Sequence, residues 1–194
     1  KEAVKWYRLA AEQNDPYAIN NLGTKYLKGL GVKKNLREAV RLFRLAAEMG
    51  NDIAQSNLGD VYREGLGVRQ DYAQAMEFYR LSAEQGNASA QNGLGYLYGE
   101  GLGVKKDFVE ALKWYRLALD QDDSWAQVNV GHHYMAGEGV TQDLEEAVRL
   151  FQLSAAQANH MGQNNLAVMY ENGLGGLDEN NEMAIAYFCL ASFG

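Results

Sequence analysis

The sequence is poor in the residues that mark several easily recognised protein classes. Its single cysteine, Cys189, cannot form an internal disulfide, so nothing in the chain requires an oxidising compartment. No apolar run approaches the roughly 18 residues of a membrane span, and no signal-like stretch of basic, apolar and small residues follows Lys1. We therefore expect no membrane span, and we assign no compartment: cytoplasmic, periplasmic and secreted locations all fit the sequence.

Positive charge is also scarce. The 18 Lys and Arg residues face 25 Asp and Glu residues, which gives a formal net charge of -7 and a pI near 5.0. Nucleic-acid binding draws much of its affinity from clustered Lys and Arg side chains that contact phosphates. The composition therefore argues against a nucleic-acid partner.

Proline is nearly absent, whereas glycine is abundant, with one Pro against 21 Gly. Helix interiors disfavour both residues, so the glycines must stand at particular points of the chain. A hydrophobic fraction of 47% is ample for a packed core, which excludes a disordered chain.

An internal repeat of 36 residues organises the chain. The string Asn21-Leu22-Gly23 returns as Asn57-Leu58-Gly59, and related strings follow at the same step through Asn165-Leu166-Ala167. The tyrosines and the glycine pairs of the repeat keep this register: Tyr26, Tyr62, Tyr98, Tyr134 and Tyr170, with Gly29/Gly31, Gly65/Gly67, Gly101/Gly103, Gly137/Gly139 and Gly173/Gly175. Chance does not produce such a register.

These repeats predict one array over residues 1–194 without internal domain boundaries. Residues 1–14 form a partial repeat that consists of a second helix only, from Lys1 to Gln13. Complete repeats follow at 15–50, 51–86, 87–122, 123–158 and 159–194. The expected secondary structure is eleven helices and no strands.

Each repeat carries two helical patterns. In the first, Ala18, Leu22 and Tyr26 form one apolar stripe, and the helix should end at Gly29 in a left-handed cap. In the second helix the stripe is Ala39, Leu42, Phe43 and Ala46.

A capping box opens each second helix. Asn35 should accept orphan backbone N–H groups, while Glu38 reaches back to the cap. The equivalent pairs are Asp71 with Gln74, Asp107 with Glu110, and Asp143 with Glu146. The last repeat fits best with one inserted residue, which makes Asn180 its cap.

This pattern closely resembles Sel1-like repeats over nearly the whole chain. The most specific stretches are Lys28 to Val32, Glu64 to Val68, and Ala111 to Ala118. The resemblance implies an all-α, right-handed superhelical α/α solenoid, similar to tetratricopeptide repeats but with a longer glycine loop. It also implies a scaffold or adaptor, frequent in bacterial proteins. Some relatives have a disulfide in each repeat, and this chain lacks those cysteines.

The residues that could carry chemistry favour structural roles. The glycine loops lack the Gly-Lys-Ser/Thr ending of a phosphate loop, and no strand precedes them. His132 and His133 are adjacent on a helix and cannot face one metal, and Cys189 has no nearby histidine and is expected to be packed. We therefore predict no enzyme activity, no cofactor and no metal. The arginines that recur on second helices, such as Arg44, are interpreted as a solvated convex face.

The functional signal is expected where the repeats differ. By analogy with related repeats, the first helices line a concave groove whose positions are free to vary with a ligand. The predicted groove residues are Tyr17, Asn20, Asn21, Thr24, Ile53, Asn57, Asp60, Asn92, Tyr96, Trp125, Val128, Asn129, His132, Met161, Asn164, Asn165 and Val168. The repeated asparagines either bind a peptide backbone or tie neighbouring helices together, and both readings stay open.

The favoured function is a protein-interaction scaffold that binds a protein or peptide in this groove, with Trp125 as the anchor. Because the groove residues are nearly uncharged, we expect only a mild dependence of binding on salt. The alternatives are a binder of a small ligand or cell-wall fragment and, last, a hydrolase. The segment 183–191 is apolar all round, which is typical of a buried helix. We expect further chain, a capping helix or self-association with a second copy to cover it.

Overall fold

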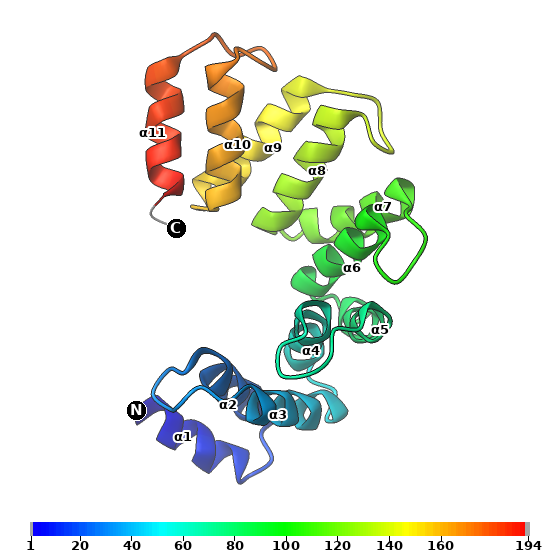
Figure 1. Ribbon diagram of the computed structural model, residues 1–194, viewed down its shortest axis with the longest axis vertical. Helices are drawn as coiled ribbons and strands as arrows, with labels where there is room; N and C mark the ends of the chain where they lie inside the picture. The colour runs from blue at the N-terminus through cyan, green and yellow to red at the C-terminus, as the bar shows by residue number, and fades with distance from the viewer. Residues whose placement is uncertain (1, 193–194) are drawn as a thin grey trace. The chain divides into compact units, whose positions relative to one another are not determined.

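The computed structural model describes residues 2–192, and over these residues the chain forms eleven helices and no strands. The predicted all-α class is therefore confirmed. The helices are α1 (Glu2–Ala11), α2 (Pro16–Lys28), α3 (Leu36–Glu48), α4 (Asp52–Glu64), α5 (Tyr72–Ala83), α6 (Ala88–Glu100), α7 (Phe108–Leu119), α8 (Ser124–Ala136), α9 (Leu144–Ala156), α10 (His160–Glu171) and α11 (Asn181–Ala191) (Figure 1). The even-numbered helices are first helices of repeats, and the odd-numbered ones are second helices.

The chain divides into two compact units. Unit 1 comprises Lys1–Leu97 and Leu102–Lys105, and unit 2 comprises Tyr98–Gly101 and Lys106–Gly194. In unit 1 the helices of a repeat pack as the pairs α2/α3 and α4/α5, and α3 also packs on α4. In unit 2 the pairs are α8/α9 and α10/α11, and α10 also packs on α9 and α8.

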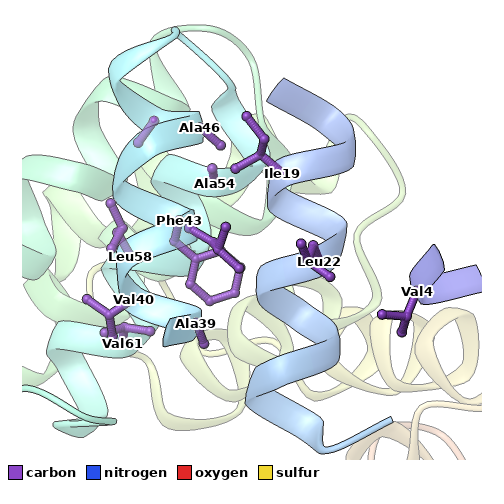
Figure 2. Packing of buried hydrophobic residues seen from close by; sticks show 12 residues of the cluster. Val4, Ile19, Leu22, Ala39, Val40, Phe43, Ala46, Ala54, Leu58 and Val61 are labelled. Atoms are coloured by element: carbon purple, nitrogen blue, oxygen red, sulfur yellow. The ribbon is translucent and has the colours of Figure 1, made fainter. Parts of the chain in front are cut away.

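The predicted apolar stripe of the second helix forms the core of the pairs α2/α3 and α8/α9. Ala39, Leu42, Phe43 and Ala46 of α3 are all buried. Figure 2 shows Phe43 facing α2, where Ile19 and Leu22 project from the opposite helix. In unit 2, Phe151 occupies the place of Phe43 and is fully buried.

Glycine in the first helix allows this close approach. A Cβ atom added at Gly131 would lie 2.6 Å from Cε1 of Phe151, and one at Gly23 would lie 2.8 Å from Cε1 of Phe43. Such separations are too short for real side chains, so the helix axes would have to move apart. In these two pairs the glycine therefore sets the distance between the helices.

The ends of the helices follow the predicted caps, with one difference. Gly29 ends α2 with φ 71°, and the Asn35 side chain accepts the N–H of Glu38 at 3.1 Å. Asn180 likewise caps α11, which confirms the inserted residue in the last repeat.

The prediction that Glu38 reaches back to the cap residue Asn35 is wrong. Glu38 does not reach back to Asn35 but holds Arg41, with an N–O distance of 2.7 Å. The reason is that the N–H of Asn35 already donates to the carbonyl oxygen of Tyr26, at 2.9 Å. The same hydrogen bond closes the other glycine loops, from Asp71 to Tyr62, Asp107 to Tyr98, Asp143 to Tyr134, and Asn180 to Tyr170.

Successive first helices are tied by polar side chains. The Asn57 amide of α4 donates to Oδ1 of Asn20 on α2 at 2.8 Å. In unit 2, Nδ2 of Asn165 on α10 lies 3.0 Å from Nε2 of His132 on α8, so the neutral imidazole accepts the amide hydrogen. In these two places the asparagines tie neighbouring helices together, which is one of the two roles that the sequence left open for them.

The apolar helix at the C-terminal end departs from expectation. Ala184 is the buried residue of α11, Tyr187 and Phe188 are half-buried, and Ile185 and Cys189 are exposed. The prediction of a packed Cys189 is therefore wrong for this chain on its own. The reason is that α11 packs on α10 through one face only.

Exchange of Gly131 tests the close approach of α8 and α9. We expect Gly131→Ala to lower the free energy of unfolding by about 1–3 kcal/mol, because the fully buried Phe151 ring has no room to move. The matched control is Gly99→Ala, where the nearest atom would be 3.7 Å away and the gain in helix propensity should leave stability equal or up to about 1 kcal/mol higher. Urea unfolding measures both, and equal effects would contradict this account.

The tie between α8 and α10 should make stability depend on pH. Burial, together with repulsion from His133, lowers the pKa of His132 below its ordinary 6.5. The unfolded chain therefore takes up this proton first, and the free energy of unfolding should fall as the pH falls below about 6.5, with a slope of at most about 1.4 kcal/mol per pH unit. In a His132→Gln variant the free energy of unfolding should fall less steeply between pH 7.5 and pH 5 than in the wild type, as measured by urea unfolding at each pH. Identical slopes in the two proteins would refute the role of His132 in this pH dependence.

Candidate functional site

The predicted groove residues fall into three classes of exposure. Six are exposed: Tyr17, Ile53, Tyr96, Trp125, Met161 and Val168. Nine are half-buried: Asn21, Thr24, Asn57, Asp60, Asn92, Asn129, His132, Asn164 and Asn165. The other two, Asn20 and Val128, are buried, with 3% and 2% of their surface exposed.

Asn20 and Val128 are therefore not available to a partner, and the prediction that these two residues line the groove is wrong. They occupy the same position in their helices, three residues after Tyr17 and Trp125. This position faces the neighbouring helix, as the hydrogen bond from Asn57 to Asn20 shows. His132 remains half-buried, but its Nε2 atom is engaged by Asn165 rather than open to a ligand.

One position of the first helix is exposed in every complete repeat. It is the second residue of the helix and is occupied by Tyr17, Ile53, Ser89, Trp125 and Met161. Four of these five side chains are large and apolar, although the position faces solvent and the fold accepts a serine there. Packing inside the chain does not explain this preference, because the side chains remain exposed.

In unit 2 this position is occupied by Trp125 on α8 and Met161 on α10. Together with His160 and Val168 of α10 they define a surface that we call the α8/α10 patch. Trp125 is 45% exposed, and its indole meets the His160 ring edge to face with centroids 5.3 Å apart. Met161 and Val168 are each 37% exposed and stand seven residues apart, on one face of α10. The patch combines an indole, a thioether and a branched aliphatic side chain on two helices that contact one another.

In unit 1 the corresponding face carries a polar cluster. The Tyr79 hydroxyl donates to Oδ1 of Asp60 at 2.6 Å, and the Arg63 guanidinium contacts both groups. Burial and the Asp60 carboxylate raise the pKa of Tyr79, so the phenol keeps its proton. Arg63 also lies over the Tyr96 ring, 5.7 Å from its centroid.

Arg63 was not among the predicted residues, and a signal for it was present in the sequence. Its position, three residues after Asp60, holds Leu27, Arg63, Gly99, Met135 and Glu171 in successive repeats. The residue at this position varies between repeats as much as the residues at the predicted groove positions. The first-helix face of unit 1 therefore carries a positive charge, Arg63, beside predicted groove residues that are nearly uncharged.

The second helices carry a different exposed row. Leu9, Leu45, Leu81, Leu117 and Leu153 take equivalent positions, and all are exposed. Because the residue is the same in each repeat, the row belongs to the repeat pattern and has no feature that would select one partner. The arginine one residue earlier is exposed but not merely solvated, since Arg44 donates to the Tyr62 hydroxyl at 2.7 Å and Arg8 to that of Tyr26 at 3.0 Å.

The structure gives no support to a metal site or a membrane span in residues 2–192. Within residues 2–192, no group of three or more His, Cys, Asp and Glu side chains is placed to hold a metal ion. Nδ1 of His133 faces the carbonyl oxygen of Glu138 at 2.9 Å, away from His132. None of the helices in that range is long and apolar enough to cross a membrane. Two surface hollows of unit 1 lie against second helices rather than the first-helix face, one beside Arg37, Arg41 and Arg44 and one beside Met76 and Leu81.

Comparison with known proteins gives a consistent result. The Sel1 repeat profile matches residues 1–15, 16–51, 52–87, 88–123, 126–159 and 160–192. Among solved structures, a Sel1 repeat protein from Oxalobacter formigenes is 34% identical with a TM-score of 0.87, and the match covers 99% of this chain and 78% of that one. A comparison with curated protein sequences found no match.

Two further structures share the fold. A protective antigen present in uropathogenic Escherichia coli strains is 36% identical with a TM-score of 0.66; the match covers 98% of this chain, which spans about half of the antigen, 48%. An immunity protein from Pseudomonas aeruginosa is 21% identical with a TM-score of 0.69, over 98% of this chain and 72% of that one, and shows the fold alone. Since the repeat profile matches nearly the whole sequence and a relative is 34% identical over 99% of it, the chain belongs to the Sel1 repeat family.

Proposed function

We propose that this chain is a non-enzymatic scaffold that binds a protein or peptide partner on its first-helix face, with the α8/α10 patch as the main contact. Sel1 repeats commonly act as protein-interaction scaffolds. The observation that carries the proposal is the exposed indole of Trp125, at a position where the fold accepts serine in another repeat.

The chemistry of the patch suits a protein surface. Tryptophan is enriched among residues that dominate binding energy in protein interfaces, and methionine adapts its shape to different partners. His160 lies against the indole edge to face and would help to exclude water from it once a partner covers the patch. The polar ties beneath, such as that between Asn165 and His132, hold α8 and α10 in place before binding.

Half-buried asparagines border the patch. Asn164 lies between Met161 and Val168 on α10 and remains half-buried. An amide here offers both a donor and an acceptor to the backbone of an extended peptide, and each such hydrogen bond contributes about 1 kcal/mol. Apolar anchoring by Trp125 would thus be combined with sequence-independent backbone contacts.

Truncation of the indole tests the proposal. Proteins captured by the wild-type chain from a lysate of its own cell of origin would be titrated against wild type, Trp125→Ala and the matched control Leu153→Ala. Leu153 is also apolar and 41% exposed, but it lies on the second helix α9. We expect Trp125→Ala to weaken binding by about thirtyfold or more, equal to about 2 kcal/mol, and Leu153→Ala to have less than about a threefold effect.

Circular dichroism would first establish that both variants fold as the wild type does. Loss of binding in Leu153→Ala with none in Trp125→Ala would place the interface on the second helices. That result would refute the proposal.

A further inference from the structure

Charge is divided very unequally between the two units. Unit 2 holds 4 of the 18 basic residues but 14 of the 25 acidic ones, for a formal charge of -10. Unit 1 holds the remaining 14 basic and 11 acidic residues, for a charge of +3. The net charge of -7 for the whole chain therefore hides a strongly acidic unit, and this is the unit that carries the α8/α10 patch.

The four positive charges of unit 2 belong to its second helices or precede one of them. Lys113 and Arg116 belong to α7, Arg149 belongs to α9, and Lys106 precedes α7. Lys113 and Arg149 are each paired with a glutamate of their own helix at 2.7 Å, and the Lys106 ammonium lies over the Phe108 ring, 4.6 Å from its centroid. Helices α8 and α10 contain no Lys or Arg at all.

Carboxylates stand at both ends of the patch. Asp122 and Asp123 immediately precede α8, whose second residue is Trp125. Glu171 ends α10, three residues after Val168 and on the same side of the helix. Along α10 the distance from Met161 to Val168 is about 10 Å, and Glu171 lies about 5 Å further on.

This arrangement selects a partner by charge. Resting on the function proposed above, we propose that the partner segment of the α8/α10 patch is a basic amphipathic peptide, with apolar side chains for Trp125, Met161 and Val168 and with Lys or Arg residues on either side. Negative charge at the rim of an apolar patch mainly raises the rate of association and rejects partners of the wrong sign. Anionic partners, including nucleic acids and acidic membrane surfaces, are repelled by the same field.

This proposal replaces the expectation that the affinity for the partner depends only mildly on salt. That expectation considered the groove residues alone, which are nearly uncharged. The carboxylates around the patch act over the Debye length of about 8 Å at physiological salt, so they reach a docked peptide without touching its apolar residues. Affinity should therefore fall markedly as salt rises.

A peptide selection tests the sign of the partner. A random displayed 12-residue library would be selected on the folded chain, with clones that also bind Trp125→Ala removed. The surviving peptides should carry a clear net positive charge relative to the unselected library. Surviving peptides that are neutral or acidic would overturn the basic partner while leaving the proposed function in place, and a lack of any Trp125-dependent peptide would overturn both.

Two double variants then locate the charge effect, with the best surviving peptide as the probe. Asp122→Asn with Glu171→Gln removes two charges beside the patch, and the control Glu145→Gln with Glu182→Gln removes two exposed charges from α9 and α11. We expect the first pair to weaken binding about fivefold or more at about 50 mM salt and the control pair less than about twofold, with the wild-type affinity falling about tenfold by about 300 mM salt. Equal losses in the two pairs, or no effect of salt, would overturn the proposal.

Discussion

The contact between a glycine of the first helix and an aromatic ring of the second is the constraint on which the pairs α2/α3, α4/α5 and α8/α9 depend. Gly23 meets Phe43, Gly59 meets Tyr79, and Gly131 meets Phe151, each at a separation that leaves no space for a Cβ atom. The ring is buried and the helix axes are close as a result. The exposed second residue of the first helix stands six residues before the glycine, about 120° around the helix from this contact, and so does not take part in it.

Much of this fold could be predicted from the sequence because its contacts repeat. The step of 36 residues located the helices, their caps and their buried stripes, and even the inserted residue before Asn180. The errors concern polar groups with more than one available partner. Glu38 pairs with Arg41 because the N–H that it was expected to accept is already bound to Tyr26, and no sequence pattern shows which of two hydrogen bonds forms.

The candidate site was predicted less completely. Periodicity identifies the face of a helix, but the part of that face covered by the next repeat depends on three-dimensional packing, so Asn20 and Val128 were placed on the surface although they are buried. Arg63 was missed because its position is not among those that line the groove by analogy with related repeats. The acidity of unit 2 was hidden because a total charge averages over units that only the contacts of the folded chain define.

The hydrogen bond that closes each glycine loop has a consequence for how the chain can change. The backbone of Asn180 reaches the carbonyl of Tyr170 just as Asn35 reaches Tyr26, although the last loop contains one residue more. The closure thus absorbs a change of length while the helices on either side keep their register. An insertion of one residue within such a loop can consequently arise without a compensating change in the helices that it connects.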